Sequence, residues 1–483
     1  MSAQQQPPVK PSFQSSVDVT SLDVTVVDDK GKPIADLAPA DFVVRIDGTA
    51  RRVVTAEWVS LVDDAGAPPP PPPDGYSTNE TATGGRLIVI AVDQPNIRFG
   101  GALAIGKAAN AFIDRLLPSD RVAVAGIGLG APSTVFTADR ARVKQAIARM
   151  VGQKATPMRS EHSIALVEAI AIERGDPGAL DTVISRECAG VSAQEAQGCR
   201  IEVESEARDK GRTANQEGDQ SVQALTALFT GLRAIDAPKT LILISEGFIA
   251  NENTGRIAEL GAMAAAARTS LYALKLDTQL FDVSNARAPV NPFADRQAQS
   301  EGLEMLAGAS RGALFTVTGA ADALFGRISS ELSGYYLLGV EADARDRDGK
   351  PHPIRVDVSR PHVIVRTQRT MLVTAPAGDA ASGRSPQQLV TAALTSPLPA
   401  SSLPLRAIAF AFRGLEPSKV RLLIHAEIGS GYTAPQRLPV AYYIVDKEGR
   451  SLDGEVTDAR VAPATSGVPS ALVFTGAVSV SPG

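Results

Sequence analysis

Two glycine-rich segments have residue types that could bind phosphate or activate a serine. Residues 101–108 nearly follow the P-loop pattern G-x-x-x-x-G-K-[ST], but alanine replaces the hydroxyl residue at Ala108 and the segment falls on a helical pattern. Residues 308–312 fit G-x-S-x-G around Ser310, but they follow a predicted helix and precede a strand, the reverse of a nucleophile elbow. We therefore expect neither Lys107 nor Ser310 to be catalytic. No carboxylate pair or Cys/His arrangement indicates catalysis either, and we predict that the chain is not an enzyme.

The two cysteines of the chain, Cys188 and Cys199, lie close together in a polar segment. Two cysteines scattered at random would rarely be so close, so we predict a disulfide, with two free surface thiols as the alternative. A disulfide requires an oxidising compartment and therefore indicates a secreted, periplasmic or cell-surface protein. The first residues show no signal peptide, and we expect the chain to begin at or near a mature N-terminus.

The hydrophobic period of the sequence changes along the chain and divides it into regions. Alternating apolar residues indicate strands before residue 62 and after residue 336. Between them, continuous apolar runs such as 86–93 and 240–247 alternate with helical patterns, as in a parallel sheet covered on both faces. The predicted regions are a disordered terminus (1–15), a small β module (16–62), a proline-rich linker (63–85), an α/β domain (86–335) with an insertion (175–220), a β extension (336–373), a linker (374–386) and a β-sandwich-like domain (387–483) that ends directly after a strand, as if truncated.

These regions predict a multidomain fold class. Its centre is a doubly wound, Rossmann-like α/β domain, flanked by the N-terminal β module and the C-terminal β-sandwich-like module. Ligands of open α/β sheets bind beyond the carboxyl ends of the strands. The candidate binding residues there are Asp93 at the end of the first apolar run and Asn96 after it, Thr156 and Ser160 in the segment 152–163, and Glu246 near the end of the run 240–247.

The order of these segments resembles a von Willebrand factor type A domain, and more closely the bacterial "VWFA-related" proteins described from acidobacteria. The resemblance covers residues 16–373. Its motifs are DVTVVDDKGKPIADLAPADFVVRIDG in front, LILISEG and LAGASRGALF within the α/β region, and YYLLGV, DGKPHPIRVDVSR and VIVR behind.

The resemblance implies a metal-ion-dependent adhesion site, in which an Asp-x-Ser-x-Ser loop, a Thr and an Asp hold Mg²⁺ through oxygen atoms. Asp93 matches the first Asp, Thr156 or Ser160 could supply the hydroxyl of the second loop, and Glu246 stands at the last acidic position. Pro95 and Ile97 occupy the two serine positions and cannot ligate a metal. We therefore expect a degenerate site without a cofactor, with Mg²⁺ at Asp93 and Glu246 as the alternative. In the structural alternative, Asp93 caps the next segment and Glu246 pairs with an arginine.

Composition agrees with a binding protein that does not contact nucleic acid. The chain has 48 basic and 53 acidic residues, a formal charge of −5, so no basic surplus is present to bind a phosphate backbone. No stretch is long and apolar enough for a transmembrane helix. We predict a non-catalytic, adhesion-type module of the cell envelope or secreted fraction that binds a protein partner. The alternatives are a structural scaffold without a ligand at this face and, third, a nucleotide hydrolase.

Overall fold

The computed structural model describes most of the chain. The described residues are 19–61, 76–79, 85–98, 101–154, 161–235, 237–250, 254–276, 290–317, 322–348, 350, 352–371, 385, 388, 390, 394, 403–414, 416, 418–446, 451–465 and 467–481. The predictions for the terminus (1–15) and for most of the two linkers lie outside these residues. Within them, no helix is both long enough and apolar enough to span a membrane.

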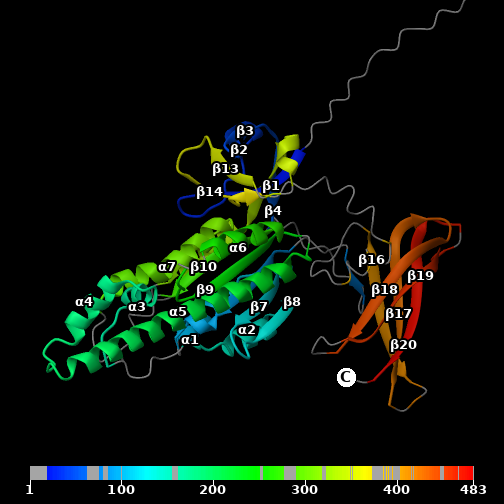
Figure 1. Ribbon diagram of the computed structural model, residues 1–483. Helices are drawn as coiled ribbons and strands as arrows, with labels where there is room; N and C mark the ends of the chain where they lie inside the picture. Colours follow the sequence, from blue (N-terminus) through cyan, green and yellow to red (C-terminus); the bar gives the residue numbers. More distant parts are fainter. Residues whose placement is uncertain are drawn as a thin grey trace, which may run out of the picture.

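Two four-stranded antiparallel sheets combine strands that are about three hundred positions apart in the sequence. Their strand orders are β14-β1-β12-β4 and β15-β13-β2-β3. The strands are β1 (Val19–Asp28), β2 (Phe42–Ile46), β3 (Thr49–Arg51), β4 (Val53–Ser60), β12 (Gly334–Glu341), β13 (His352–Val358), β14 (Val363–Arg366) and β15 (Thr370–Met371). Because β12 pairs with β1 on one side and β4 on the other, the predicted N-terminal module and β extension form one unit, the paired-sheet unit (Figure 1).

One shared core explains the alternating pattern in these strands. Leu22 and Val24 of β1 lie with Phe42 of β2 and Tyr336 of β12 in one buried cluster. The Tyr336 ring makes edge contacts with Phe42 and Trp58, and its hydroxyl accepts a hydrogen bond of 2.8 Å from the Leu37 backbone N–H. The alternation is clear in β2 and β13, whose buried residues are every second one, whereas the central strand β12 is buried along most of its length.

The paired-sheet unit contains a histidine between two carboxylates, which makes its stability depend on pH. His352 Nδ1 lies 2.7 Å from Asp47 Oδ2, and Nε2 lies 3.0 Å from Asp348 Oδ1. The Asp47 carboxylate raises the pKa of His352 above its ordinary value of 6.5. Protonated His352 therefore stabilises the folded state. This stabilisation is complete below pH 6.5, the ordinary pKa, and is lost as the pH rises through the raised pKa of the folded state.

We expect the melting temperature of the full chain to fall as the pH rises from 6.5 through the raised pKa of His352. His352→Gln should remove this part of the pH dependence, because glutamine cannot take up a proton. His425→Gln, in a different sheet, is the matched control. An unchanged pH profile in His352→Gln would contradict the assignment.

A second domain is built around a six-stranded sheet, whose strands lie in the sequence between β4 and β12 of the paired-sheet unit. Its order is β11-β10-β9-β6-β7-β8, and all neighbours are parallel except β7 and β8. The strands are β6 (Leu87–Asp93), β7 (Arg121–Ile127), β8 (Ser133–Thr137), β9 (Lys239–Ser245), β10 (Thr269–Leu276) and β11 (Ala313–Val317). Every residue of β6, β9 and β10 is buried, which is why these strands are continuous apolar runs in the sequence.

Helices cover the two faces of this sheet and form two separate cores. Phe112 and Phe325 belong to one core, and Leu225 and Leu260 belong to the other. The helices are α1 (Gly101–Asp114), α2 (Arg140–Ala148), α5 (Ala196–Leu232), α6 (Thr254–Ala266), α7 (Pro292–Ala309) and α8 (Asp322–Glu331). Figure 1 shows α5 extending well beyond the sheet, where it is joined by α3 (Leu166–Glu173) and α4 (Pro177–Glu187). We call α3, α4 and this outer part of α5 the helical arm.

The C-terminal region is one antiparallel sheet rather than two. Its order is β18-β19-β20-β17-β16-β5. The strands are β5 (Ser77–Thr78), β16 (Leu405–Arg413), β17 (Val420–Tyr432), β18 (Gln436–Val445), β19 (Ser451–Pro463) and β20 (Ser470–Val480). Because β19 pairs with β20 only through its last two residues, the β18–β19 hairpin can turn back, and Tyr442 of β18 contacts Phe474 of β20.

The predicted fold class is wrong for this chain. The structure is β-rich, with 33% helix, 40% strand and several antiparallel sheets, rather than a central doubly wound α/β domain with separate flanking modules. The pairing of β1 and β4 with β12, and the single C-terminal sheet, account for the difference. Local hydrophobic periodicity indicates strands, but it does not indicate which distant strand each one pairs with.

Candidate functional site

Asp93 is the centre of a buried hydrogen-bond network at the carboxyl end of β6. Its side chain has no exposed surface. The Ser221 hydroxyl of α5 donates to Asp93 Oδ1 over 2.6 Å, and the Ser245 hydroxyl at the end of β9 donates to Oδ2 over 2.8 Å. Two carboxylate oxygens are thus each bound by a hydroxyl from a different element. We call Asp93, Asn96, Ser221 and Ser245 the Asp93 network.

Asn96 completes the network from a short 3-10 helix, η2 (Gln94–Asn96), that directly follows β6. Its amide nitrogen lies 3.2 and 3.1 Å from the two Asp93 oxygens and 2.8 Å from the Ser221 hydroxyl. Ser245 in turn accepts from the Gly247 backbone N–H over 3.0 Å. Each serine hydroxyl therefore accepts a hydrogen bond from an N–H group and donates one to the Asp93 carboxylate.

Burial and hydrogen bonding act on Asp93 in opposite directions. Loss of hydration is the larger effect and raises the pKa of the Asp93 carboxyl. The donors from Ser221, Ser245 and Asn96 favour the ionised form and oppose this rise. The network thus supplies, from inside the protein, part of the compensation that a buried carboxylate requires.

Glu246 is held by an arginine next to the same loop. Arg98 donates to the Glu246 carboxylate twice, from its backbone N–H over 3.0 Å and from its Nε over 2.9 Å. The Glu246 side chain is almost fully buried, whereas that of Arg98 is 35% exposed. The structure therefore agrees with the expectation that Glu246 pairs with an arginine, but Asp93 accepts no hydrogen bond as a helix cap of η2.

The next loop, at residues 151–154, is fastened to η2 by the backbone. Gln153 N–H donates to Gln94 O over 2.7 Å, and Lys154 N–H donates to Ile97 O over 3.0 Å. The Gln94 side chain accepts from Val151 N–H over 2.8 Å. Thr156 and Ser160, the predicted hydroxyl ligands, lie outside the described residues.

The carboxylate oxygens of Asp93 and Glu246 all accept hydrogen bonds within the protein. A divalent cation also binds oxygen lone pairs, so it would have to replace some of these hydrogen bonds. Pro95 and Ile97 offer no side-chain oxygen. In the described part of the chain, no group of three or more His, Cys, Asp or Glu side chains could hold a metal ion.

We expect that titration of Mg²⁺ or Mn²⁺ into the full chain gives no saturable heat and no change in melting temperature. The reason is that a cation would have to break several hydrogen bonds to reach Asp93. A heat signal that disappears in Asp93→Asn, which keeps the shape of the side chain, would contradict this and restore a metal site.

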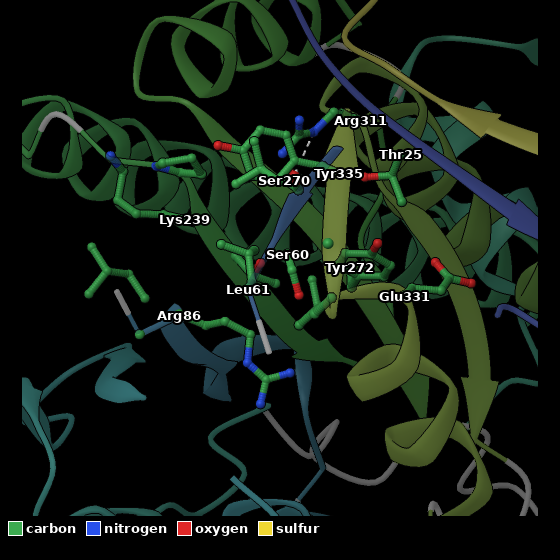
Figure 2. A pocket seen from close by; sticks show the side chains of 17 residues that line it. Thr25, Ser60, Leu61, Arg86, Lys239, Ser270, Tyr272, Arg311, Glu331 and Tyr335 are labelled. Carbon is green, nitrogen blue, oxygen red and sulfur yellow. Dashed lines mark hydrogen bonds between the residues drawn. The ribbon is translucent and has the colours of Figure 1, made fainter. Parts of the chain in front are cut away.

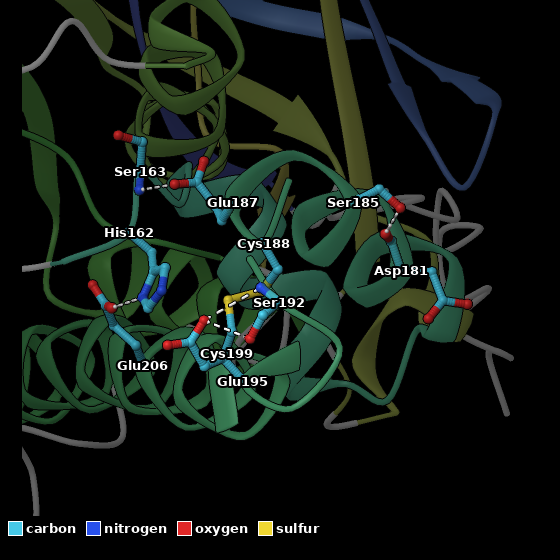
Figure 3. Close-up of a disulfide and its surroundings, with 10 residues drawn as sticks. All are labelled: His162, Ser163, Asp181, Ser185, Glu187, Cys188, Ser192, Glu195, Cys199 and Glu206. Atoms are coloured by element: carbon cyan, nitrogen blue, oxygen red, sulfur yellow. Dashed lines mark hydrogen bonds and ion pairs between the residues drawn. A yellow bond between two sulfur atoms is a disulfide. The ribbon is translucent and has the colours of Figure 1, made fainter. Parts of the chain in front are cut away.

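Cys188 and Cys199 form a disulfide within the helical arm, 11 positions apart. Cys188 follows α4 and Cys199 lies in the first turn of α5, so the bond closes the turn between the two helices (Figure 3). Both cysteines pack against a small core that includes Val183 and Val203. The segment predicted as an insertion is therefore helical and has a core of its own.

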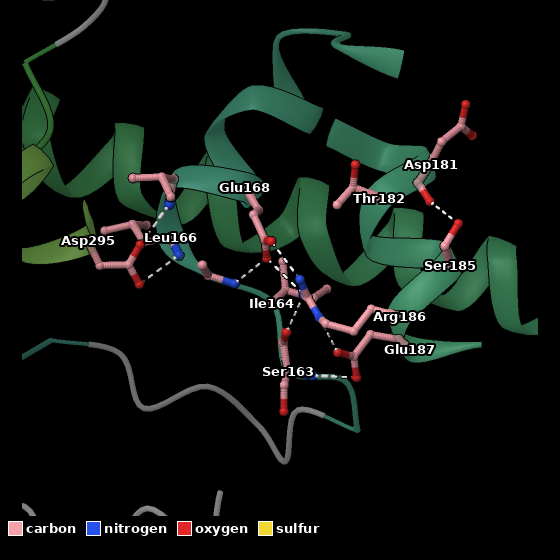
Figure 4. Close-up of polar contacts among 12 residues, drawn as sticks. Ser163, Ile164, Leu166, Glu168, Asp181, Thr182, Ser185, Arg186, Glu187 and Asp295 are labelled. Carbon is pink, nitrogen blue, oxygen red and sulfur yellow. Dashed lines mark hydrogen bonds and ion pairs between the residues drawn. The ribbon is translucent and has the colours of Figure 1, made fainter. Parts of the chain in front are cut away.

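Arg186 of α4 connects this helix to α3 and to the segment before α3, and its guanidinium makes four hydrogen bonds. Its guanidinium donates to both oxygens of Glu168, to Glu187 and to the Ser163 carbonyl (Figure 4). Burial alone would raise the pKa values of Glu168 and Glu187. The hydrogen bonds from Arg186 outweigh burial, so both pKa values lie below their ordinary range. Asp295 of α7 accepts from the first backbone N–H groups of α3 over 3.0 Å, which fixes the arm to the sheet domain.

Leu129 projects from the same edge of the sheet as Asp93. It lies in the turn between β7 and β8, and its surface is 93% exposed. The Gln153 amide donates to the Leu129 carbonyl over 2.9 Å, so the turn is held to the 151–154 loop. Asp93 is directly opposite Ile127 in the β6–β7 register, which places Leu129 close to the Asp93 network.

The sequence indicates Asp93, Asn96 and Glu246 at this edge of the sheet, and Ser245 belongs to the same strand end as Glu246. It does not indicate Ser221 or Arg98. Ser221 had no local signal, because it lies on a helix 128 positions from Asp93. No protein-family profile matches the chain, and no curated protein is significantly similar to it in sequence.

Proposed function

We propose that the chain is a non-catalytic protein-interaction module that binds its partner without a bridging metal. The observation that carries this proposal is the exposure of Leu129 on a turn that is fixed beside the Asp93 network. We infer that the Leu129 side chain enters an apolar pocket of the partner, where burial would remove its exposed surface from water. The resemblance to the VWFA-related proteins favours an adhesion-type role for this edge.

The exposed leucine indicates the kind of partner surface. We propose a protein partner with an apolar pocket that receives Leu129, and no nucleic-acid partner. The disulfide supports an extracytoplasmic location, where such bonds persist.

Leu129→Asp is expected to weaken partner binding at least about tenfold, as for loss of a buried apolar anchor. The full chain would be used to capture its partner from envelope and secreted fractions, and the dissociation constant would be measured with the purified partner. Val135→Asp is the matched control, because Val135 is 73% exposed on β8 of the same sheet.

Equal binding by Leu129→Asp and Val135→Asp would exclude this edge as the interaction face. It would favour the scaffold alternative, for which the closed Asp93 network is also suitable. Melting temperatures of both variants close to that of the parent chain would show that neither substitution acts by unfolding.

A further inference from the structure

The strand β18 lies at one edge of the C-terminal sheet, and within the described residues its only strand neighbour is β19. All ten of its residues pair with β19, from Gln436 opposite Val461 to Val445 opposite Ser451. In an antiparallel ladder, alternate residues direct their N–H and C=O groups to one neighbour and the rest direct them to the other side. Every second residue of β18 therefore presents its backbone groups to the free side of the strand.

The other edge strands in the described part of the chain are short, or are charged and partly covered. Free backbone groups at a sheet edge attract further strands, and proteins limit this with short edges, charged side chains or covering segments. The next longest edge strand, β4, has eight residues and contains Glu57, and its residues Val59 and Ser60 line a cavity together with Tyr272 of β10 (Figure 2). The remaining edge strands have two to five residues; they are β3, β5, β8, β11, β14 and β15.

Most of β18 lacks the features that protect such an edge. Its last eight residues, 438–445 (LPVAYYIV), include no charged side chain. Pro439 interrupts the edge near its beginning, because proline has no N–H to donate. The segment 440–445 after it consists of β-branched and aromatic residues and one alanine, and the first two types favour strand pairing.

An apolar row lies on the outer face of this edge. Tyr442 packs against the buried cluster of the C-terminal sheet and so marks the core face of β18. Because side chains alternate along a strand, Ala441, Tyr443 and Val445 lie on the opposite face, where Tyr443 and Val445 are exposed. Val456 of β19 is opposite Ala441 and is exposed as well. We call Ala441, Tyr443, Val445 and Val456 the outer row.

The Tyr443 ring leaves the free side of β18 accessible. The ring lies over Gly454, the residue opposite Tyr443 in β19, where an added Cβ would collide with it. It therefore leans toward the interior of the sheet and not across the edge. A strand that approaches from the free side meets the backbone of β18 directly.

Pro439 also indicates which residues of β18 can pair. Within sheets, proline occurs on edge strands with its nitrogen on the solvent side. Ala441, Tyr443 and Val445 then direct their N–H and C=O groups to the same free side, because the direction alternates along the strand. A second β18, related by a two-fold axis at Tyr443, would place Tyr443 opposite its own counterpart and Ala441 opposite Val445. This register uses all three residues and avoids Pro439.

We propose that β18 pairs antiparallel with β18 of a second copy of this chain, so that the two C-terminal sheets form one continuous sheet. Every residue of the segment 441–445 then meets an uncharged residue, and the outer rows of the two copies form one apolar surface. The contact is isologous and closes after two copies, which distinguishes it from open-ended aggregation. The edge lies in a different sheet from Leu129, so this inference is independent of the proposed interaction face.

A second copy is the occupant that the chemistry of the edge favours. A strand of another protein could add to the same edge, but it would have to bring an uncharged, apolar segment that matches the outer row. β18 is itself such a segment. In the register centred on Tyr443, the small Ala441 faces the branched Val445, and Tyr442 faces Ile444, so the strand is complementary to itself.

The test uses the full chain and measures its mass by sedimentation velocity over a range of concentrations. We expect a monomer at low concentration and a discrete dimer at high concentration. Tyr443→Lys places two like charges opposite each other at the two-fold axis, and it should weaken dimerisation about tenfold or more. Val468→Lys is the matched control, because Val468 is also exposed but lies between β19 and β20.

Amide hydrogen exchange of the unsubstituted chain locates the contact without any variant, so the test stays decisive if Tyr443→Lys does not fold. The N–H groups of Ala441, Tyr443 and Val445 should exchange more slowly at high than at low concentration, with β17 unchanged.

Four results would each overturn the proposal. The first is a chain that stays monomeric up to about 1 mM, which would leave the edge to a strand of another protein. The second is a series of oligomers that grows beyond the dimer. The third is a dimer in which the exchange of the three N–H groups does not depend on concentration. The fourth is equal dimerisation by Tyr443→Lys and Val468→Lys, which would assign the dimer to another surface.

Discussion

Asp93→Ala is expected to lower the free energy of unfolding by on the order of 4 kcal/mol, because several buried donors lose their acceptor at about 1–3 kcal/mol each. The donors are the hydroxyls of Ser221 and Ser245 and the amide of Asn96. They come from three elements of the sheet domain, so the loss would loosen the contact of α5 and β9 with η2. Chemical denaturation of the full chain, followed by circular dichroism, measures the effect.

Two further variants distinguish the hydrogen-bond network from a general effect of removing a carboxylate. Asp93→Asn keeps one acceptor oxygen and the shape of the side chain, so its loss should be clearly smaller. Asp114→Ala removes a carboxylate whose side chain is 61% exposed and pairs with Lys144, and it should change the stability by less than about 0.5 kcal/mol. If Asp93→Ala were as mild as Asp114→Ala, the network would contribute little to folding.

Removal of the disulfide is expected to destabilise the helical arm by about 3 kcal/mol, since the bond closes a short loop in the unfolded chain. The effect should be local, because the contacts of α4 are with α3, with α5 and with Ser163 just before α3. Hydrogen exchange after reduction should therefore show loss of protection in α4 and the first turns of α5, with β9 and β10 unchanged.

The reduced chain, with its thiols left unmodified, is compared with the oxidised chain, so that no side chain changes. Cys188→Ala together with Cys199→Ala should behave like the reduced chain, with a small added loss because both cysteines pack on the arm core. Unchanged exchange in α4 would show that the Arg186 contacts alone hold the arm together.

The elements that the sequence predicted well are those buried on all sides. The apolar runs at 86–93 and 240–247 correspond to β6 and β9, because every residue of these strands is covered by helices or neighbouring strands. The helical arm was missed, since its packing uses small residues. At Gly211 of α5, an added Cβ would lie 2.8 Å from the Ala169 carbonyl of α3, so the two helices approach too closely for a larger side chain.

Only the part of the candidate site that lies at the ends of apolar strands could be predicted from the sequence. Asp93, Asn96 and Glu246 follow apolar strands, a position that sequence periodicity reveals. Their partners Ser221 and Arg98 depend on how α5 and the η2 loop pack, which no local pattern encodes. The pairing of β1 with β12 was hidden in the same way, because the two strands resemble any other half-buried strands.

The pairing of β1 and β4 with β12 also imposes an order in time on the synthesis of the chain. Ser60 has its strand partner at Gly334, so the first strands cannot complete their sheet until some 270 further residues have been made. At about 5–20 residues per second, this delay lasts roughly 14–54 s. Throughout that interval the apolar faces of β1 and β2 have no native cover, so the nascent chain is most open to aggregation at its beginning. A chaperone that binds the first sixty residues should therefore increase the yield of folded protein more than one that binds the C-terminal sheet.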